Sequence, residues 1–208
     1  MRKNDFINGL INFVPKDSIN YYINILNKYK FSFFIKNPRK LKMGDFKVDL
    51  KTNNLTITIN NNLHPYQFHL TFLHEFAHLK TFLKYGRGIK PHGIEWKTEF
   101  QKLIADSIER KIFNIEASSV LTDCYLRHNH FNSNCQKFDL FIKNIENPFW
   151  LSVKDIPDNT FFMLKPTYRK FKKIKKRRTR YLCEESKTKR QYLVSQNAEI
   201  FNFNFLLK

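Results

Sequence analysis

Residues 74–78 of the chain read His74-Glu75-Phe76-Ala77-His78. On an α-helix, residues four apart lie one turn above each other, so His74 and His78 direct two imidazoles at one point, with Glu75 beside them. This is the HExxH arrangement of zinc hydrolases. In such sites the imidazoles and a third protein ligand hold the ion, which lowers the pKa of a water molecule to about 7, and the glutamate acts as general base. We therefore predict two metal ligands, His74 and His78, and a catalytic base, Glu75.

The sequence around this pentapeptide predicts a long amphipathic helix. Pro65 suits a first helical turn. The apolar residues that follow at helical spacing are Phe68, Phe72, Phe76, Leu79 and Leu83. Glu75 falls nearly on this stripe, and a carboxylate aimed at a core needs a partner, which a metal-bound water would provide. The alternative is that the pentapeptide arises by chance on an ordinary helix with two half-buried histidines.

A third histidine follows at a distance that favours the metal site. Tyr85-Gly86-Arg87-Gly88 can end the helix and turn the chain, and the segment Lys90-Pro91-His92-Gly93 then precedes a second helix. That second helix is predicted from the shared face of Trp96, Phe100, Leu103, Ile104 and Ile108. His92 is thus placed to return toward His74 and His78 as a third ligand.

These residues resemble the SprT-like family of metalloproteases, of the bacterial SprT and Spartan type. The resemblance rests on HEFAH, a short loop, and then His92, Gly93 and Trp96, and residues 38–46 and 57–63 lie where the family carries its Arg…Gly and Ile-x-Ile-Asn…Leu segments. It covers about residues 15–110. The resemblance implies one Zn²⁺ on the three histidines and a substrate class, namely proteins bound or crosslinked to DNA.

The expected fold class is α+β. A helix around residues 19–26, a strand at 31–35, a hairpin of strands around 46–50 and 55–59, and the two helices described above make a minimal zincin-like plan, with the HExxH helix under a small sheet. We predict a SprT-like zincin domain over residues 1–115, a linking helical or irregular segment over 116–157, and a basic β-hairpin module over 158–208.

The C-terminal module is expected to be rich in β-structure. Strand patterns occur at residues 161–164, 168–171, 179–183 and 191–194, and Ser186-Lys187-Thr188-Lys189 suits a hairpin turn between the last two. Bacterial members of the resembling family often carry a zinc ribbon at this place. Cys183 is the only cysteine of the region, so the module resembles a zinc ribbon without its cysteines and must fold by packing its apolar residues.

The formal net charge of +19 predicts attraction to polyanions, nucleic acid first. Residues 165–190 hold 13 basic and two acidic residues, so more than half of the net charge lies in an eighth of the chain. The predicted phosphate-binding residues are Arg169, Lys172, Lys173, Lys175, Lys176, Arg177, Arg178 and Arg180. Four rings between them, Tyr168, Phe171, Tyr181 and Tyr192, would suit base stacking. The alternative is a solvated surface that is basic through compositional bias.

The three cysteines are few, odd in number and unlike a disulfide framework, which agrees with a reducing compartment. A second metal site at Cys124, His128, His130 and Cys135 is a weaker alternative to a polar loop with incidental histidines. No run reaches the roughly 18 apolar residues of a membrane span, and the N-terminus has no signal-like apolar stretch. We expect a monomer in the cytoplasm of a bacterial-type cell, associated with the nucleoid. It is expected to bind DNA without sequence preference and not to bind membranes.

Three functions remain open at this point. The leading one is a zinc metallopeptidase acting on DNA-bound proteins. A nucleic-acid-binding protein with a structural or idle metal site is the second, although such a site has no use for a base at Glu75. A zinc amidohydrolase of another substrate class is the third.

Overall fold

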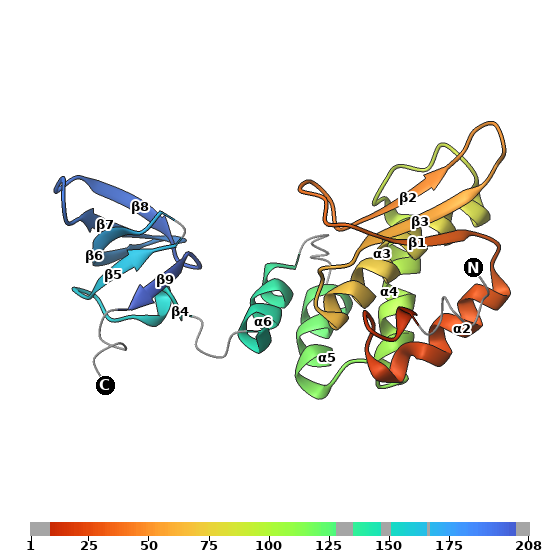
Figure 1. The fold of residues 1–208 in the computed structure, drawn as a ribbon, viewed down its shortest axis with the longest axis horizontal. Coiled ribbons are helices and arrows are strands. Elements are labelled where there is room, and N and C mark those ends of the chain that lie inside the picture. Colours follow the sequence, from red (N-terminus) through yellow and green to blue (C-terminus); the bar gives the residue numbers. More distant parts are fainter. Residues whose placement is uncertain (1–8, 128–134, 147–150, 166, 203–208) are drawn as a thin grey trace. The chain divides into compact units, whose positions relative to one another are not determined.

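The computed structural model describes residues 9–127, 135–146, 151–165 and 167–202, which form an α+β protein (Figure 1). The chain divides into two compact units, Met1–Ile142 and Lys143–Lys208. In the described ranges, no helix has both the length and the apolar content that crossing a membrane requires.

A three-stranded sheet lies in the first unit. Its strands are β1 (Ser32–Lys36), β2 (Gly44–Val48) and β3 (Leu55–Asn60), in the order β1-β3-β2. β2 and β3 form the predicted antiparallel hairpin, whereas β1 runs parallel to β3. Ile57 and Ile59 of β3 are fully buried and alternate with partly exposed residues, so one face of the sheet covers the core.

The helices that pack beneath this sheet carry the core of the first unit (Figure 1). The 3-10 turn η1 (Lys16–Ser18) leads into α2 (Ile19–Lys28), and the HExxH helix is α3 (Pro65–Tyr85). After these come α4 (Ile94–Glu109), α5 (Ile115–Leu121), the π-helical turn η2 (Thr122–Leu126) and α6 (Gln136–Glu146).

The ends of α3 agree with its sequence signals. The His64 ring accepts a hydrogen bond from the Tyr66 amide, Pro65 occupies the first turn, and Gly86 ends the helix at a φ of 74°. Four members of the predicted apolar stripe are buried, but Leu83 is 53% exposed because the last turn extends beyond the core.

The second unit is a six-stranded antiparallel sheet in the order β4-β9-β5-β6-β7-β8. Its strands are β4 (Leu151–Ser152), β5 (Phe161–Leu164), β6 (Arg169–Arg177), β7 (Arg180–Glu185), β8 (Gln191–Ser195) and β9 (Glu199–Asn202), with the 3-10 turn η3 (Val153–Asp155) after β4. β7 and β8 form the predicted hairpin. β4 and β9 were not predicted, because the pairing of two short strands distant in sequence leaves no local pattern.

The predicted linking segment of residues 116–157 differs from the structure. Ala117, Leu121 and Phe138 belong to the core of the first unit, whereas Val153 and Ile156 belong to the core of the second. The boundary therefore falls within α6, because apolar residues on both sides of it are absorbed into one core or the other.

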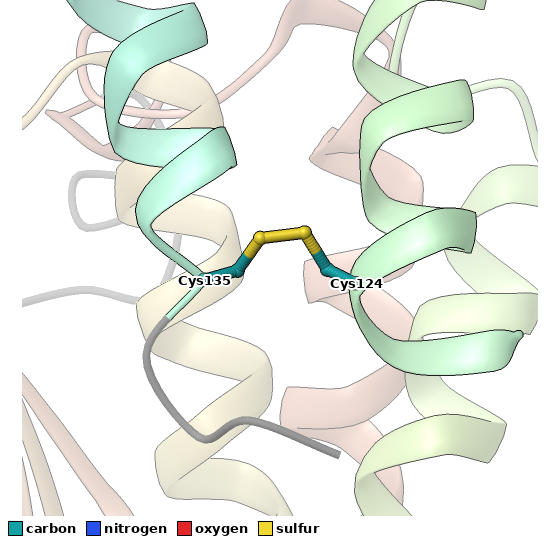
Figure 2. The surroundings of a disulfide bond; sticks show 2 residues. All are labelled: Cys124 and Cys135. Atoms are coloured by element: carbon teal, nitrogen blue, oxygen red, sulfur yellow. A yellow bond between two sulfur atoms is a disulfide. The ribbon is translucent and has the colours of Figure 1, made fainter. Parts of the chain in front are cut away.

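The expectation that the cysteines stay unpaired is wrong for two of the three. The sulfur atoms of Cys124, in η2, and Cys135, just ahead of α6, are joined in a disulfide (Figure 2). Their Cα atoms are 5.9 Å apart, within the range that a disulfide needs. Cys183 remains a buried thiol. The cysteine count therefore gives no support to a reducing compartment.

Candidate metal centre

The three predicted ligands come together in the structure. The Nε2 atom of His92 lies 3.0 Å from Nε2 of His74 and 3.1 Å from Nε2 of His78. His74 and His78 are supplied by successive turns of α3, and His92 by the loop that leads into α4. In the described ranges this is the one group of three or more potential ligands whose donor atoms converge closely enough for a metal ion.

The turn that presents His92 requires an unusual backbone. His92 itself has a φ of 58°, in the left-handed region that most residues avoid. The Gly93 amide donates to the Lys90 carbonyl oxygen at 2.8 Å, and a Cβ at Gly93 would lie 2.9 Å from that same oxygen. Gly93 is therefore needed for a close backbone approach, which explains the His-Gly pair in the sequence.

Aromatic rings of α4 support all three imidazoles. The ring of Trp96 is 99% buried, and its centroid lies 4.6, 5.1 and 4.5 Å from those of His74, His78 and His92. Its Nε1 donates to the His74 carbonyl oxygen at 3.3 Å. Phe100 stacks on Trp96 and contacts the edge of His74. These contacts fix the ring positions before any ligand binds, as a precise site requires.

The imidazoles are held in the protonation state that metal binding needs. Burial lowers the pKa of His74 to about 3 and that of His78 to about 4, with their histidine neighbours adding to the effect. Burial also lowers the pKa of His92. At neutral pH all three rings are therefore uncharged, and a metal ion need displace no proton from them. Three converging imidazole nitrogens fit Zn²⁺, and they also suit Cu, Fe and Ni.

Glu75 lies against the edge strand of the sheet. Its side chain is 8% exposed, and an imaginary Cβ at Gly44 of β2 would lie 2.8 Å from its Oε1 atom. Burial, together with the charge of Asp45, raises the pKa of Glu75 to about 7, against a hydrogen bond from the Phe46 amide. A carboxyl group with such a pKa can take up and release protons near neutrality.

The environment of Glu75 was not anticipated from the sequence. In the structure the Glu75 carboxylate accepts a hydrogen bond from the Phe46 amide of β2. Gly44 leaves the space that the carboxylate fills. An isolated glycine in a strand often marks a place where another group approaches the backbone closely, so Gly44 was the sequence feature that could have indicated this contact.

A fourth histidine of α3 serves the core. His69 is fully buried, and its ring nitrogens lie 3.0 Å from the Tyr22 hydroxyl and 3.1 Å from the Ser107 hydroxyl. Burial lowers its pKa to about 3. Its partners on α2 and α4 show that the ring joins three helices through hydrogen bonds.

The weaker prediction of a second metal site finds no support. Cys124 and Cys135 are joined to each other, so neither offers a thiolate. His128 and His130 lie outside the described residues.

In the second unit, the predicted phosphate-binding residues separate into four groups, of which three are exposed or partly exposed. Five of them surround the tip of the β6–β7 hairpin and are exposed, and within the described part of the chain none makes an ion pair: Lys175, Lys176, Arg177, Arg178 and Arg180. Lys172 lies further down β6, partly buried and opposite Glu184. Arg169 is bound to Glu185 at 2.7 Å, which compensates its charge.

The assignment of Lys173 to a phosphate-binding surface is wrong. The residue is 3% exposed, and its Nζ atom donates to the Ile156 carbonyl oxygen at 2.5 Å. The same atom lies 3.4 Å from Asp158 and 3.9 Å from the centre of the Tyr181 ring. Lys173 points inward because it shares a face of β6 with Phe171, two residues earlier.

Two of the four predicted stacking rings are also unavailable. Phe171 and Tyr181 are buried in the core of the second unit, because a module without zinc must fold on its apolar residues. Tyr192 packs partly against the same core, and only Tyr168 is widely exposed, at 65%.

Comparison of the chain with protein-family models, with curated proteins and with solved structures finds no match.

Proposed function

We propose that the protein is a zinc metallopeptidase of SprT-like type that cleaves proteins bound or crosslinked to DNA. The observation that carries this proposal is the convergence of the three imidazoles, with Nε2 of His92 at 3.0 and 3.1 Å from Nε2 of His74 and His78. Glu75 follows directly after His74 on α3. The uncharged state of the three rings supports a metal site, and the raised pKa of Glu75 supports a role in proton transfer.

In this proposal each residue of the site has a separate role. His74, His78 and His92 would hold one Zn²⁺. When bound, the ion would act as a Lewis acid that polarises the scissile carbonyl and lowers the pKa of the attacking water. Glu75 takes the proton of that water at a carboxylate oxygen and then delivers it to the leaving amine nitrogen. Trp96 and Phe100 keep the imidazole rings in place and exclude water from one side of the site.

DNA would be bound by the tip of the β6–β7 hairpin, defined by Lys175, Lys176, Arg177, Arg178 and Arg180. Five exposed cations without ion-pair partners in the described ranges support contacts to phosphates, which carry no sequence information. Binding through this tip would bring DNA-bound proteins to the peptidase.

The proposal is tested with Glu75→Gln, which keeps the size of the side chain and removes the base. Cleavage of a DNA-bound protein substrate should fall by about 10²-fold or more, while one zinc per chain remains. The matched control is Glu109→Gln, the same chemical change at an exposed position on α4. Undiminished cleavage by Glu75→Gln would reject the mechanism, and loss of zinc together with activity would make Glu75 a structural residue.

A further inference from the structure

The outer face of the three-stranded sheet has a hollow that the metal centre does not use. It measures about 400 Å³ and is lined by Lys36, Asn37, Arg39, Asp45, Lys47 and Thr58. α2, α3 and α4 lie on the opposite side of this sheet (Figure 1), and the strand residues that face outward alternate with the buried ones. The hollow therefore opens away from the core that carries the histidines.

Arg39 is held in this hollow by neutral groups. Its Nε donates to Asn60 Oδ1 at 2.8 Å, and its terminal nitrogens donate to the hydroxyl and carbonyl oxygens of Thr58 at 2.9 and 3.5 Å. In the described ranges it makes no ion pair, so its charge is not compensated by a carboxylate. A guanidinium has five N–H donors, and two remain available in a fixed orientation, as in a site for a phosphate group.

The surroundings of Arg39 add to the positive charge. Lys36 and Lys47 stand on the flanking strands β1 and β2, both exposed. The one carboxylate of the hollow, Asp45, is bound to Lys42 at 3.0 Å and to Lys47 at 3.6 Å. The four cations exceed this single anion, so the face as a whole attracts anions.

An exposed aromatic ring stands on the same outer face of the sheet. Phe34 of β1 is 49% exposed, and in the sheet it is paired in register with Thr58, the residue that Arg39 binds. Lys36 Nζ lies 5.3 Å from the centre of the Phe34 ring. A ring on an open sheet face beside fixed cations is the combination with which proteins bind single-stranded nucleic acids, since phosphates pair with the cations and a base stacks on the ring.

We propose that this face, defined by Phe34, Lys36, Arg39 and Lys47, binds single-stranded nucleic acid through the phosphate backbone and one stacked base. The inference goes beyond the proposed function, because it places a strand-binding surface on the unit that carries the metal centre, independent of the β6–β7 tip. Duplex DNA fits less well, since its bases are already stacked on each other and cannot reach Phe34.

The test uses full-length protein in which Lys175, Lys176, Arg177 and Arg178 are changed to Gln, so that the β6–β7 tip no longer dominates binding. In this background, Lys36→Gln with Lys47→Gln is compared with Lys28→Gln and Lys137→Gln, an equal charge change at exposed positions on α2 and α6. Arg39 is left intact because its charge also acts on Glu75.

Affinity for a labelled oligothymidylate is measured by fluorescence anisotropy across a salt series. Losing two phosphate contacts should flatten the slope of log K against log salt by about 1.4, since each contact on a single strand contributes about 0.7. Phe34→Ala should weaken binding roughly tenfold with little change in slope, because it removes stacking and no charge. Its control is Leu41→Ala, at a side chain that is 98% exposed.

Two results would overturn the proposal. If the Lys36 and Lys47 pair behaves like its control pair, the face does not contact phosphates. If inorganic polyphosphate competes as well as the oligonucleotide and Phe34→Ala has no effect, the hollow is a simple anion site and the nucleic-acid assignment is wrong. Photocrosslinking of a bromouracil oligonucleotide to a β1 peptide would support the proposal. Zinc content of the same preparations, and the Glu75→Gln assay on a chain with the β6–β7 tip intact, report separately on the proposed function.

Discussion

Gly44→Ala tests whether the position of the Glu75 carboxylate, as well as its presence, matters for catalysis. A Cβ at residue 44 would lie 2.7 Å from Thr71 Cγ2 and 2.8 Å from both Cγ and Oε1 of Glu75. An ordinary contact begins at 3.4 Å, so the Glu75 side chain must move by about 0.6 Å. The substitution acts through its contacts with Glu75 and Thr71 and not through backbone strain, because the φ angle of Gly44 is not in the left-handed region.

The expected magnitudes differ between stability and activity. Overpacking costs about 1–3 kcal/mol, and the smaller backbone entropy of the unfolded alanine chain returns roughly 0.5–1 kcal/mol of this. Stability should therefore fall by roughly 0–2.5 kcal/mol. Misplacement of a catalytic group by a large fraction of an ångström costs up to about 10²-fold in rate, so kcat/KM should fall by roughly 10- to 100-fold.

The assay combines kcat/KM on a DNA-bound protein substrate with zinc analysis and the urea midpoint of unfolding. Gly9→Ala is the matched control, since an added Cβ there meets nothing within 4 Å. A Gly44→Ala protein that binds zinc, unfolds normally and retains full activity would refute the reasoning, because the base would then not act from the place where Glu75 lies.

Three other predictions concern stability. Burial lowers the pKa of His69 to about 3, so between about pH 6.5 and pH 3 the imidazole is protonated in the unfolded chain but not in the folded one. The free energy of unfolding should therefore decrease as the pH falls through this range. A His69→Gln variant whose stability depends on pH as steeply as that of the unaltered protein would contradict this. Reduction of Cys124–Cys135, which are 11 residues apart, should lower stability by about 2–3 kcal/mol in calorimetry, and Cys124→Ala/Cys135→Ala should be insensitive to reductant. Lys173→Met should lower the free energy of unfolding in urea by roughly 1–3 kcal/mol, since it removes the buried donor to a backbone carbonyl. The matched change Lys175→Met, at an exposed position, should weaken DNA binding without destabilising the protein. Equal effects of the two variants on stability and on DNA binding would show that the two lysines do not have different roles.

The parts of the site that were predictable are those set by local spacing. His74 and His78 share a helix face because they are four residues apart, and the long apolar period around them defines α3. His92 was placed correctly near them because a short glycine-containing turn between two helices leaves little choice of direction. The inward face of β6 follows from spacing in the same way, since Lys173 is two residues from Phe171 and shares its buried face. The prediction of a phosphate contact for Lys173 rested on its charge alone and is wrong.

By itself, the sequence determined the HExxH helix, the following helix, the β2–β3 hairpin and the β7–β8 hairpin, since each depends on residues close together in the chain. Only the tertiary structure decided which distant segments meet. The parallel pairing of β1 with β3, the Cys124–Cys135 bond, the space that Gly44 leaves for Glu75, and the boundary within α6 are of this kind. Such contacts arise when separate helices and strands pack together to bury their apolar faces. The sequence pattern of one element shows which of its faces is apolar, but it does not indicate which other element will pack against that face.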